Sequence, residues 1–353
     1  MNRHRVLASL LSLVIASAFC QAQSFVLDLP RSSQHALISQ RVGITDITIN
    51  YHRPLVNGRK IWGGLVPYGQ VWRAGANENT TITFSDPVTI EGKPLDKGTY
   101  GLHMIPGESQ WTVIFSKNST SWGSFTYNQA EDVLRVDVKP QATELHDALT
   151  YDFPEVKPDS TVVTLAWEKI AVPFTVGVNT KEIVADNLHK QLRGLAQYSW
   201  DGWNDAANYL LDNNLHLDEA LQYEDSSIQN EERFENLLTK SRILDALGRK
   251  QDATATRDKA LAKAAPLQLH LYARQLQGQK KQDEAFAIFR ANYKKYPSEW
   301  FVHTGMARIY SAQGDFDNAA KEMRTARASA PDQQKSYVDG LVRRLEAKED
   351  INK

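Results

Sequence analysis

The sequence predicts two units of different fold class, an antiparallel β-sandwich or jelly-roll followed by an α-helical solenoid. Hydrophobic residues alternate in short runs between residues 45 and 178, whereas a pattern that repeats about every 34 residues fills the rest of the chain. The length of 353 residues is typical of two domains, and 42% hydrophobic with 24% charged residues is the composition of a folded protein. We therefore expect a β domain over residues 30–178 and a helical domain over residues 180–350.

The N-terminus, residues 1–22, has the three-part pattern of a secretory signal peptide. Arg3 and Arg5 precede an apolar run over residues 6–19, and small residues follow around Ala18 and Ala22. Such a run is too short to span a bilayer comfortably, and it has no polar face of the kind that a surface helix shows. An amphipathic or buried N-terminal helix is the alternative. We expect export to the periplasm or the extracellular space, and no transmembrane segment once residues 1–22 are removed.

Charge and cysteine content narrow the possible functions. The formal net charge of -1 and the pI of about 6.8 provide no basic field, so we expect no nucleic-acid partner. Cys20, the only cysteine, lies in the region of cleavage, and bulky Phe19 precedes it where a lipid-anchored protein has a small residue. Cleavage beyond Cys20 leaves no thiol, which excludes disulfides and cysteine-based metal sites or nucleophiles.

Short strands separated by turns account for the β domain. The runs "ITDITINYH" and "TTITFS" alternate, and "PVTIEGKPLDKGTYGLHMIPGESQWTVIF" contains three β-rich runs divided by Gly-Lys-Pro and Pro-Gly-Glu turns. Four further runs follow, "VLRVDVKP", "ELHDALTYDFP", "TVVTLAWEKI" and "VPFTVGV". About nine strands with no amphipathic helix between them indicate an antiparallel sandwich and not a parallel α/β sheet.

Three segments of the helical domain align with one another. They are "GRKQDATATRDKALAKAAP", "QKKQDEAFAIFRANYKKYP" and "QGDFDNAAKEMRTARASAP", and Ala253, Ala285 and Ala319 occupy the same position in each. The segment "WDGWNDAANYLLDNNLHLDEALQYEDSSIQ" fits as a degenerate first unit. The pattern resembles tetratricopeptide repeats, although His303 stands where a large aromatic residue is usual.

The resemblance implies stacked helix pairs with a concave surface that holds a peptide or a protein segment. Gly248 and Gly314 are expected in turns between paired helices, and small residues are expected where the helices approach closely. A generic helical bundle is the alternative fold. The concave surface could also be filled by the β domain, and the sequence leaves this choice open.

The run "YHRPLVNGRKIWGGLVPYGQVWRAGANENT" carries a second resemblance. Its Tyr-x-Arg-Pro, Gly-Arg, Pro-Tyr-Gly and Trp-Arg-x-Gly-Ala-Asn-Glu elements lie between Tyr51 and Glu78. Together with the β runs that follow, they are similar to an exported bacterial family known as a domain of unknown function, number twenty-nine eleven. The resemblance covers residues 30–178 and implies a fold and an exported location, but no activity. A tetratricopeptide-like region behind this domain is a familiar arrangement in the family.

The same run contains the candidate ligand site. Its aromatic rings are too apolar to leave in water, since each buries about 150–250 Å² in a core. Its guanidinium groups need planar acceptors, which a carboxylate such as Glu78 or an anionic or sugar-like ligand would supply. The sequence leaves open whether these residues form an internal network or an open binding site. The candidate ligand-binding residues are Arg53, Arg59, Trp62, Tyr68, Trp72, Arg73, Asn77 and Glu78.

Evidence for catalysis in the sequence is weak. His52, His103 and Glu78 are the candidates for a general acid or base, and each is an isolated residue. The sequence contains no His-Glu-x-x-His, no Gly-x-Ser-x-Gly, no P-loop and no calcium-loop pattern, so we expect neither a metal nor a cofactor. A second aromatic loop, "SKNSTSWGSFTYN", either lies at the same end of the sandwich as Arg73 or is a solvent-exposed turn.

These observations predict a non-enzymatic binding or scaffold protein of the cell envelope. We expect a ligand or partner site on the β domain and docking of a protein or peptide on the helical repeats. The alternative is an envelope enzyme that acts on a glycan or a peptide-like substrate.

Overall fold

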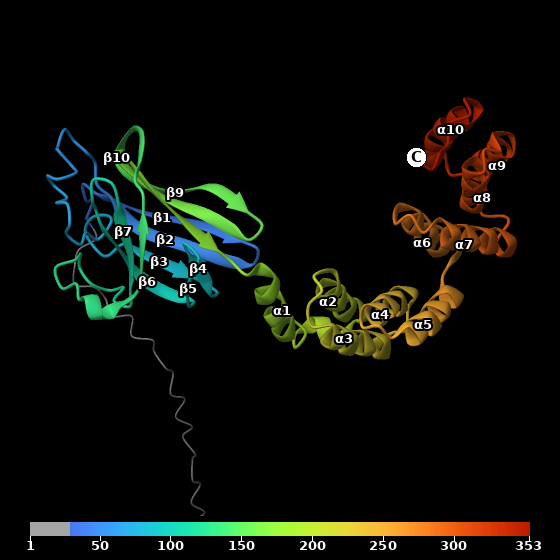
Figure 1. The fold of residues 1–353 in the computed structure, drawn as a ribbon, viewed down its shortest axis with the longest axis horizontal. Coiled ribbons are helices and arrows are strands. Elements are labelled where there is room, and N and C mark those ends of the chain that lie inside the picture. The colour runs from blue at the N-terminus through green and yellow to red at the C-terminus, as the bar shows by residue number, and fades with distance from the viewer. Residues whose placement is uncertain (1–28) are drawn as a thin grey trace, which may run out of the picture. The chain divides into compact units, whose positions relative to one another are not determined.

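The computed structural model describes residues 29–353 and divides between Thr180 and Lys181 into two compact units, the β unit and the helical unit (Figure 1). The predicted signal peptide, residues 1–22 with Cys20, lies outside the described residues. Among residues 29–353, no helix has both the length and the apolar character needed to cross a membrane.

The β unit consists of ten strands in two antiparallel sheets. The larger sheet has the order β1 (Gln34–Val42), β2 (Thr45–Arg53), β3 (Thr81–Phe84), β6 (Gly98–Ile105), β7 (Trp111–Ser116) and β8 (Asp132–Val138). The smaller sheet has the order β5 (Lys93–Leu95), β4 (Val88–Ile90), β10 (Ser160–Gly177) and β9 (Gln141–Lys157).

The apolar faces of the two sheets pack against each other. In β2, Ile47, Ile49 and Tyr51 are buried while the intervening residues are more accessible, as expected for a strand with one face on the core. The rings of Phe115 in β7 and Phe174 in β10 meet with centroids 6.0 Å apart. The predicted all-β fold with antiparallel sheets is therefore confirmed.

The strands differ from the predicted runs in two places. Strand β1 lies before the predicted β-rich region. Its side chains are mostly accessible, so the hydrophobic pattern of its sequence is too weak to indicate a strand. The last three predicted runs form only two strands, β9 and β10, of 17 and 18 residues. Proline interrupts neither strand, since Pro154 lies in the edge strand β9 and Pro173 lies between the segments of β10 that pair with β9 and with β4.

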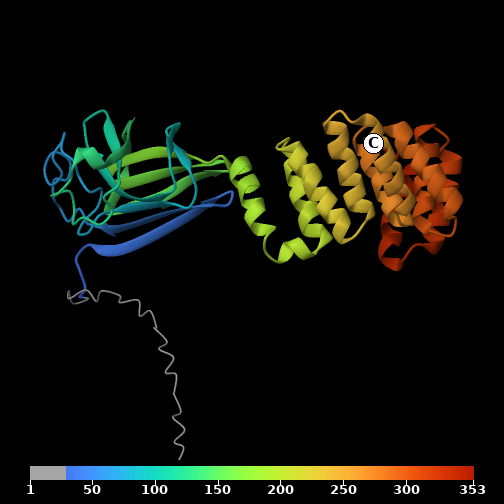
Figure 2. The same ribbon diagram turned by 90° about the horizontal axis from the view of Figure 1, so that it is seen from below.

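The helical unit is an array of helix pairs (Figure 2). Pairs are formed by α2 with α3, α4 with α5, α6 with α7 and α8 with α9, and α10 packs on α9. The helices are α1 (Thr180–Gln191), α2 (Trp200–Asp212), α3 (Leu217–Asn230), α4 (Phe234–Ala246), α5 (Lys250–Lys263), α6 (Pro266–Gly278), α7 (Gln282–Lys295), α8 (Trp300–Ala312), α9 (Phe316–Ser329) and α10 (Asp332–Glu346).

The turns and contacts within the pairs repeat with the sequence. Asn214, Gly248, Lys280 and Gly314 each lie in the turn between paired helices with φ of 53°, 78°, 63° and 77°. Alanines at the predicted close approaches, Ala253, Ala285 and Ala319 among them, are buried. In Figure 1 the unit curves, with α2, α4 and α6 on the inside and α3, α5 and α7 on the outside. The predicted solenoid is therefore confirmed by its own packing.

Candidate functional site

The segment between β2 and β3, residues 54–80, is a folded structure fixed to the sandwich. Trp72 and Met104 exchange two backbone hydrogen bonds of 2.8 Å, which ties the segment to β6. The Ala74 carbonyl accepts hydrogen bonds from the Tyr151 and Thr80 hydroxyls, at 2.9 and 3.2 Å. Ala74 itself has a φ of 49°, a left-handed conformation that persists only where the surroundings enforce it and that is concentrated at functional sites.

Two of the predicted aromatic residues belong to a cluster of four tryptophans. Trp62 is 9% exposed and its ring lies 4.8 to 5.7 Å from those of Trp72, Trp111 and Trp167. Trp72 is half-buried and stacks on Trp167 at 5.9 Å and 18°. Trp62 is thus a core residue, whereas Trp72 also presents a surface. Tyr68, 42% exposed, covers Gly63.

Trp72 lines a pocket of about 500 Å³ at this end of the β unit. Four of the predicted ligand-binding residues contribute to its wall, and Ser33 and Trp167 complete the polar and aromatic parts. The four are Arg59, Trp72, Arg73 and Asn77. The other four predicted residues, Arg53, Trp62, Tyr68 and Glu78, do not line it.

The three predicted arginines have different environments. Arg53 donates to the Leu149 carbonyl at 2.9 Å and to the Thr150 hydroxyl at 2.8 Å, so it joins β2 to β9. Arg59 is exposed and donates to the carbonyls of two neighbouring residues in its own segment. Arg53 and Arg59 therefore donate to the protein's own oxygens.

Arg73 differs, because none of the described residues accepts a hydrogen bond from it or forms an ion pair with it, and its Nε is buried. Burial lowers the pKa of its guanidinium, which still stays charged at neutral pH. Its guanidinium carbon lies 5.9 Å from the ring of Phe125. A Cβ on Gly123 would clash with the Arg73 Nη1. The second aromatic loop therefore lies at the same end as Arg73.

Two side chains of this aromatic loop are exposed beside the pocket wall. Phe125 is 83% exposed and Trp122 is 55% exposed. The Arg31 guanidinium carbon lies 5.6 Å from the Trp122 ring. Exposed aromatic rings with cations over them are available for contact with a ligand.

Glu78 pairs with Arg31 and not with an arginine of its own segment. Arg31 Nη1 lies 2.6 Å from Glu78 Oε1, and His52 Nε2 lies 3.4 Å from Glu78 Oε2. Burial alone would raise the pKa of the Glu78 carboxyl, but the hydrogen bond from Arg31 helps to lower it. Burial lowers the pKa of His52. Together with His35, these residues line a second pocket of about 420 Å³.

Ser33 lines both pockets, and the side-chain amide of Asn77 donates to its carbonyl at 3.2 Å. The predicted residues are thus divided between two neighbouring pockets. Sequence reasoning missed Arg31, because it lies 47 residues before its partner Glu78 and has no local pattern.

His103 is not available as an open acid or base. It is 2% exposed, its Nδ1 lies 2.9 Å from the Ser124 hydroxyl, and its ring packs on Tyr127 at 5.4 Å. Burial lowers its pKa to about 4. The imidazole is therefore neutral at pH 7 and fixes the aromatic loop to β6.

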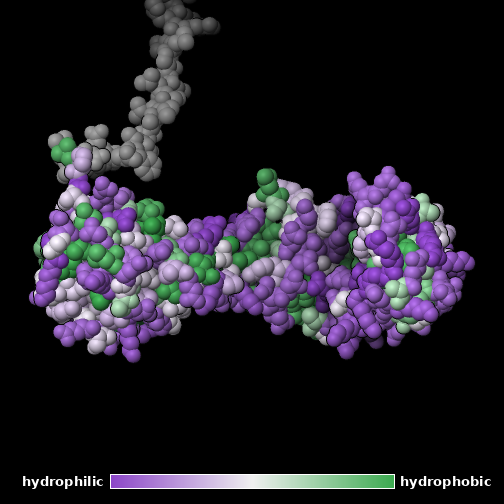
Figure 3. Space-filling model, turned by 90° about the horizontal axis from the view of Figure 1, so that it is seen from above, coloured by the Kyte–Doolittle hydropathy of each residue, from purple (hydrophilic) through white to green (hydrophobic). Residues whose placement is uncertain are grey.

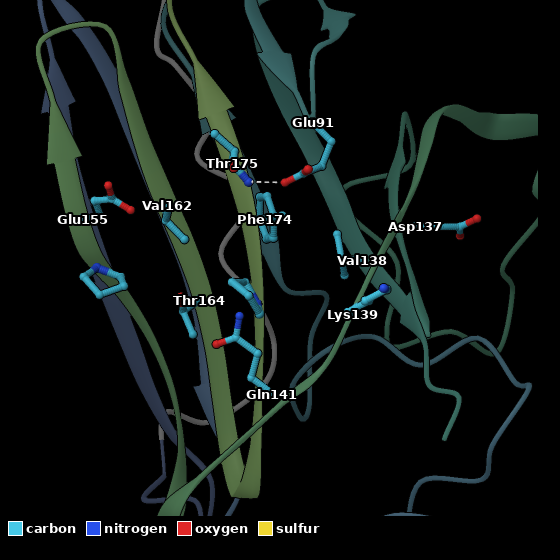
Figure 4. Close-up of a pocket in the computed structure, with 12 residues that line it drawn as sticks. Glu91, Asp137, Val138, Lys139, Gln141, Glu155, Val162, Thr164, Phe174 and Thr175 are labelled. Atoms are coloured by element: carbon cyan, nitrogen blue, oxygen red, sulfur yellow. Dashed lines mark hydrogen bonds between the residues drawn. The ribbon is translucent and has the colours of Figure 1, made fainter. Parts of the chain in front are cut away.

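A pocket of about 570 Å³ lies elsewhere on the β unit, where β8, β9 and β10 meet (Figure 4). Its carboxylates are engaged by neighbours, since Glu91 accepts from the Thr175 backbone amide at 2.5 Å and Asp137 accepts from the Thr112 hydroxyl at 2.7 Å. It is slightly larger than the Arg73 pocket, but among the residues described it has no unpartnered buried cation. Across residues 29–353, no three His, Cys, Asp or Glu side chains are grouped so as to hold a metal ion.

Comparison with known proteins found one family and a similar solved structure. Residues 33–176 match the model of a family described as "Protein of unknown function (DUF2911)", which confirms the resemblance seen in the β domain. A similar solved structure is described as "Crystal structure of YrrB: a TPR protein with an unusual peptide-binding site". That similarity has 14% identity and a TM-score of 0.26, and covers 46% of this chain and 86% of the other. No curated protein matches the chain.

Proposed function

We propose that the β unit is a non-enzymatic binding module for a small anionic ligand and that the helical unit docks a protein partner. Arg73 is the observation that carries the first part. It lies on the wall of the 500 Å³ pocket, and no described residue satisfies its guanidinium. A half-buried cation without an acceptor binds an anion that replaces the lost hydration, whereas Arg53 and Arg59 have no such need.

The surroundings of Arg73 favour a ligand with a planar anionic group on a ring-shaped body. A guanidinium binds a carboxylate through two parallel hydrogen bonds. The half-buried ring of Trp72, stacked on buried Trp167, provides an apolar surface in the same pocket, and the Arg73 guanidinium lies over the Phe125 ring. Sugar acids combine these features, and a volume of about 500 Å³ is within the range of small-ligand sites.

Isothermal calorimetry with galacturonate oligosaccharides tests this proposal. We expect saturable binding to the wild-type protein, no binding of the matching neutral galactose oligosaccharides, and at least a tenfold loss in Arg73→Gln. Arg59→Gln is the matched control, because Arg59 lines the same pocket but is already satisfied. Equal binding of charged and neutral sugars, or equal losses in both variants, would remove Arg73 from the site.

The proposed cellular location is the envelope or the extracellular space. The signal-peptide pattern of residues 1–22 supports export. Cell fractionation with N-terminal sequencing tests it: we expect a mature chain that begins shortly after Ala22 outside the cytoplasm. A cytoplasmic chain that keeps Met1 would contradict the proposal.

One observation favours the enzymatic alternative. His52 and Glu78 converge at 3.4 Å on the wall of the 420 Å³ pocket, where they could exchange a proton with a bound glycan or peptide. However, Arg31 already forms an ion pair with Glu78. Hydrolysis of envelope glycans by the wild-type protein, lost in both His52→Asn and Glu78→Gln, would establish this alternative over pure binding.

A further inference from the structure

The helical unit contains a row of arginines at one repeat position. Arg242, Arg274 and Arg308 each precede the buried alanine of their repeat, Ala253, Ala285 or Ala319, by the same number of positions. They belong to α4, α6 and α8, the first helices of successive pairs. Because equivalent positions of stacked repeats face the same side, the three side chains form a ladder on one face of the unit.

Only the first of these arginines is neutralised. Arg242 pairs with Asp212 at 2.8 Å. Arg274 donates only to the Gln277 side chain, at 3.4 Å. Arg308 is 4% exposed and donates to the Ile351 carbonyl at 2.9 Å and to the Tyr337 hydroxyl at 3.3 Å. Within residues 29–353, neither Arg274 nor Arg308 has a carboxylate partner.

Two buried nitrogens, one on Arg308 and one on His270, also lack hydrogen-bond partners within residues 29–353. Arg308 Nε donates to no neighbour among the described residues, and Nδ1 of His270, which is 8% exposed, has no hydrogen-bond partner among them either. Burial and the two guanidiniums lower the pKa of His270 to about 4, and burial with Arg274 nearby lowers the pKa of Arg308 to about 10. Burying a cation without a counter-charge is unfavourable, so this face is complementary to an anion.

The C-terminal segment, residues 350–352, lies across the ladder. The Ile351 amide donates to the Ser311 hydroxyl at 3.0 Å, while the Asn352 side chain bridges Gln277 and the Arg308 carbonyl with two hydrogen bonds of 2.9 Å. The Ile351 side chain is 4% exposed in the core formed by α8, α9 and α10. The face therefore holds an extended backbone together with one apolar side chain.

Residues 350–352 form hydrogen bonds with this face but provide no negative charge to pair with Arg274 or Arg308. It offers Arg308 a neutral carbonyl, and its one acid, Asp350, accepts from Ser311 at 2.9 Å and from Asn352 at 2.8 Å. In Figure 3, hydrophilic side chains predominate on the visible face of the last helices. An extended peptide with carboxylates in place of these neutral groups would fit the same contacts better.

We infer that this face of α6 and α8 docks an extended acidic segment of a partner protein, and that residues 350–352 occupy the site until the partner displaces them. The inference rests on the proposed protein-docking role of the helical unit and names the chemistry of the partner. Carboxylates of the partner segment pair with Arg274 and Arg308, and an apolar residue takes the place of Ile351.

Fluorescence anisotropy with the full mature chain tests the inference. The probe is a labelled peptide of residues 346–353 carrying K348E and K353E, and its control has every acid replaced by the amide. We expect the acidic peptide to bind at least tenfold more tightly than the amide peptide. Ile351→Asp, which detaches the chain's own segment, should bind the acidic peptide at least fivefold more tightly than the wild-type protein.

Two charge variants decide whether the ladder is responsible. Arg274→Glu should lose at least tenfold in affinity, whereas Arg290→Glu, exposed on α7, should change it less than twofold, with both folded by circular dichroism. Equal binding of acidic and amide peptides, or equal affinities of the two variants, would overturn the inference while leaving protein docking intact. Failure of both peptides to bind even Ile351→Asp would count against the inference and the docking role together.

Discussion

Arg73 of the β unit and Arg308 of the helical unit both lack a carboxylate partner among the described residues, but the two units position them in different ways. Arg73 is positioned by an irregular segment with residues in left-handed conformations. Gly123, which is distant in the sequence but adjacent in space, leaves room for its guanidinium. A repeat position places Arg308, in register with Arg242 and Arg274. The residues of a site built by repeats can be located from their spacing in the sequence, whereas those of a site built by loops can be located only from the three-dimensional structure.

The largest expected effect is a loss of stability when an arginine with hydrogen bonds inside the β unit is replaced, compared with an arginine that has none. Arg53→Met breaks two hydrogen bonds to β9 and should destabilise the protein by about 2–4 kcal/mol, because two part-buried acceptors lose a charged donor. Arg73→Met should change stability by less than about 1 kcal/mol, since it removes no hydrogen bond within the described protein. Urea unfolding measures both. Similar losses would show that Arg73 is also structural and would remove the contrast.

The next largest effect is a dependence of stability on pH, caused by a buried carboxyl group in the helical unit. Glu224 is 0% exposed, neither of its oxygens has a partner among the described residues, and burial raises its pKa to about 8. The folded chain keeps a proton that the unfolded chain releases near pH 4.5, so this stabilisation is complete below pH 4.5 and is lost as the pH rises through 8.

Glu224→Gln should therefore be more stable than the wild-type protein by about 1–3 kcal/mol at pH 9 and nearly equal to it at pH 5. Asp258→Asn, exposed on α5, is the control and should show no such difference. Thermal unfolding at the two pH values measures it. A gain that does not depend on pH would mean that Glu224 is ionised in the folded state.

Buried histidines should make both units sensitive to acid. His103 in the β unit and His270 in the helical unit have pKa values near 4 instead of 6.5 because of burial. The unfolded chain takes up protons below pH 6.5 that the folded chain refuses, so stability is complete above pH 6.5 and falls as the pH drops towards 4.

We expect each histidine to cost its unit about 2 kcal/mol between pH 6.5 and 4.5. NMR titration of the imidazole carbons, combined with urea unfolding, measures both quantities. An imidazole that titrates near pH 6.5 in the folded chain would show that its environment is open to water.

The smallest effect tests how Gly123 supports Arg73. Gly123 and Gly69 have φ of 70° and 73°, so alanine strains the backbone similarly at both. Only at Gly123 would the new Cβ displace the Arg73 guanidinium. Gly123→Ala should weaken galacturonate binding about fivefold, or about 1 kcal/mol, and Gly69→Ala less than twofold. Equal weakening would mean that the position of Arg73 does not matter for binding.

The sequence predicted the two fold classes and the repeat turns, because strand alternation and the recurrence of Ala253, Ala285 and Ala319 are visible along the chain itself. It did not predict which arginine of the β unit would remain free. The acceptors of Arg53 lie 96 and 97 residues away in the sequence, in β9, and the partner of Glu78 is Arg31, 47 residues before it. Contacts at such separations cannot be read from a local pattern. Nor did it single out Arg274 and Arg308, because the small residues carry the repeat pattern and the spacing of an arginine from Ala285 or Ala319 does not show which groups surround it.

The most direct test of the account is the Nε–Hε resonance of Arg73, followed by NMR while galacturonate oligosaccharide is added. We expect a saturable shift of the Arg73 signal, with the affinity found by calorimetry, while the signal of Arg53, which does not line the pocket, stays in place. An Arg73 signal that does not move, or that is already protected from exchange without ligand to the same degree as that of Arg53, would contradict it.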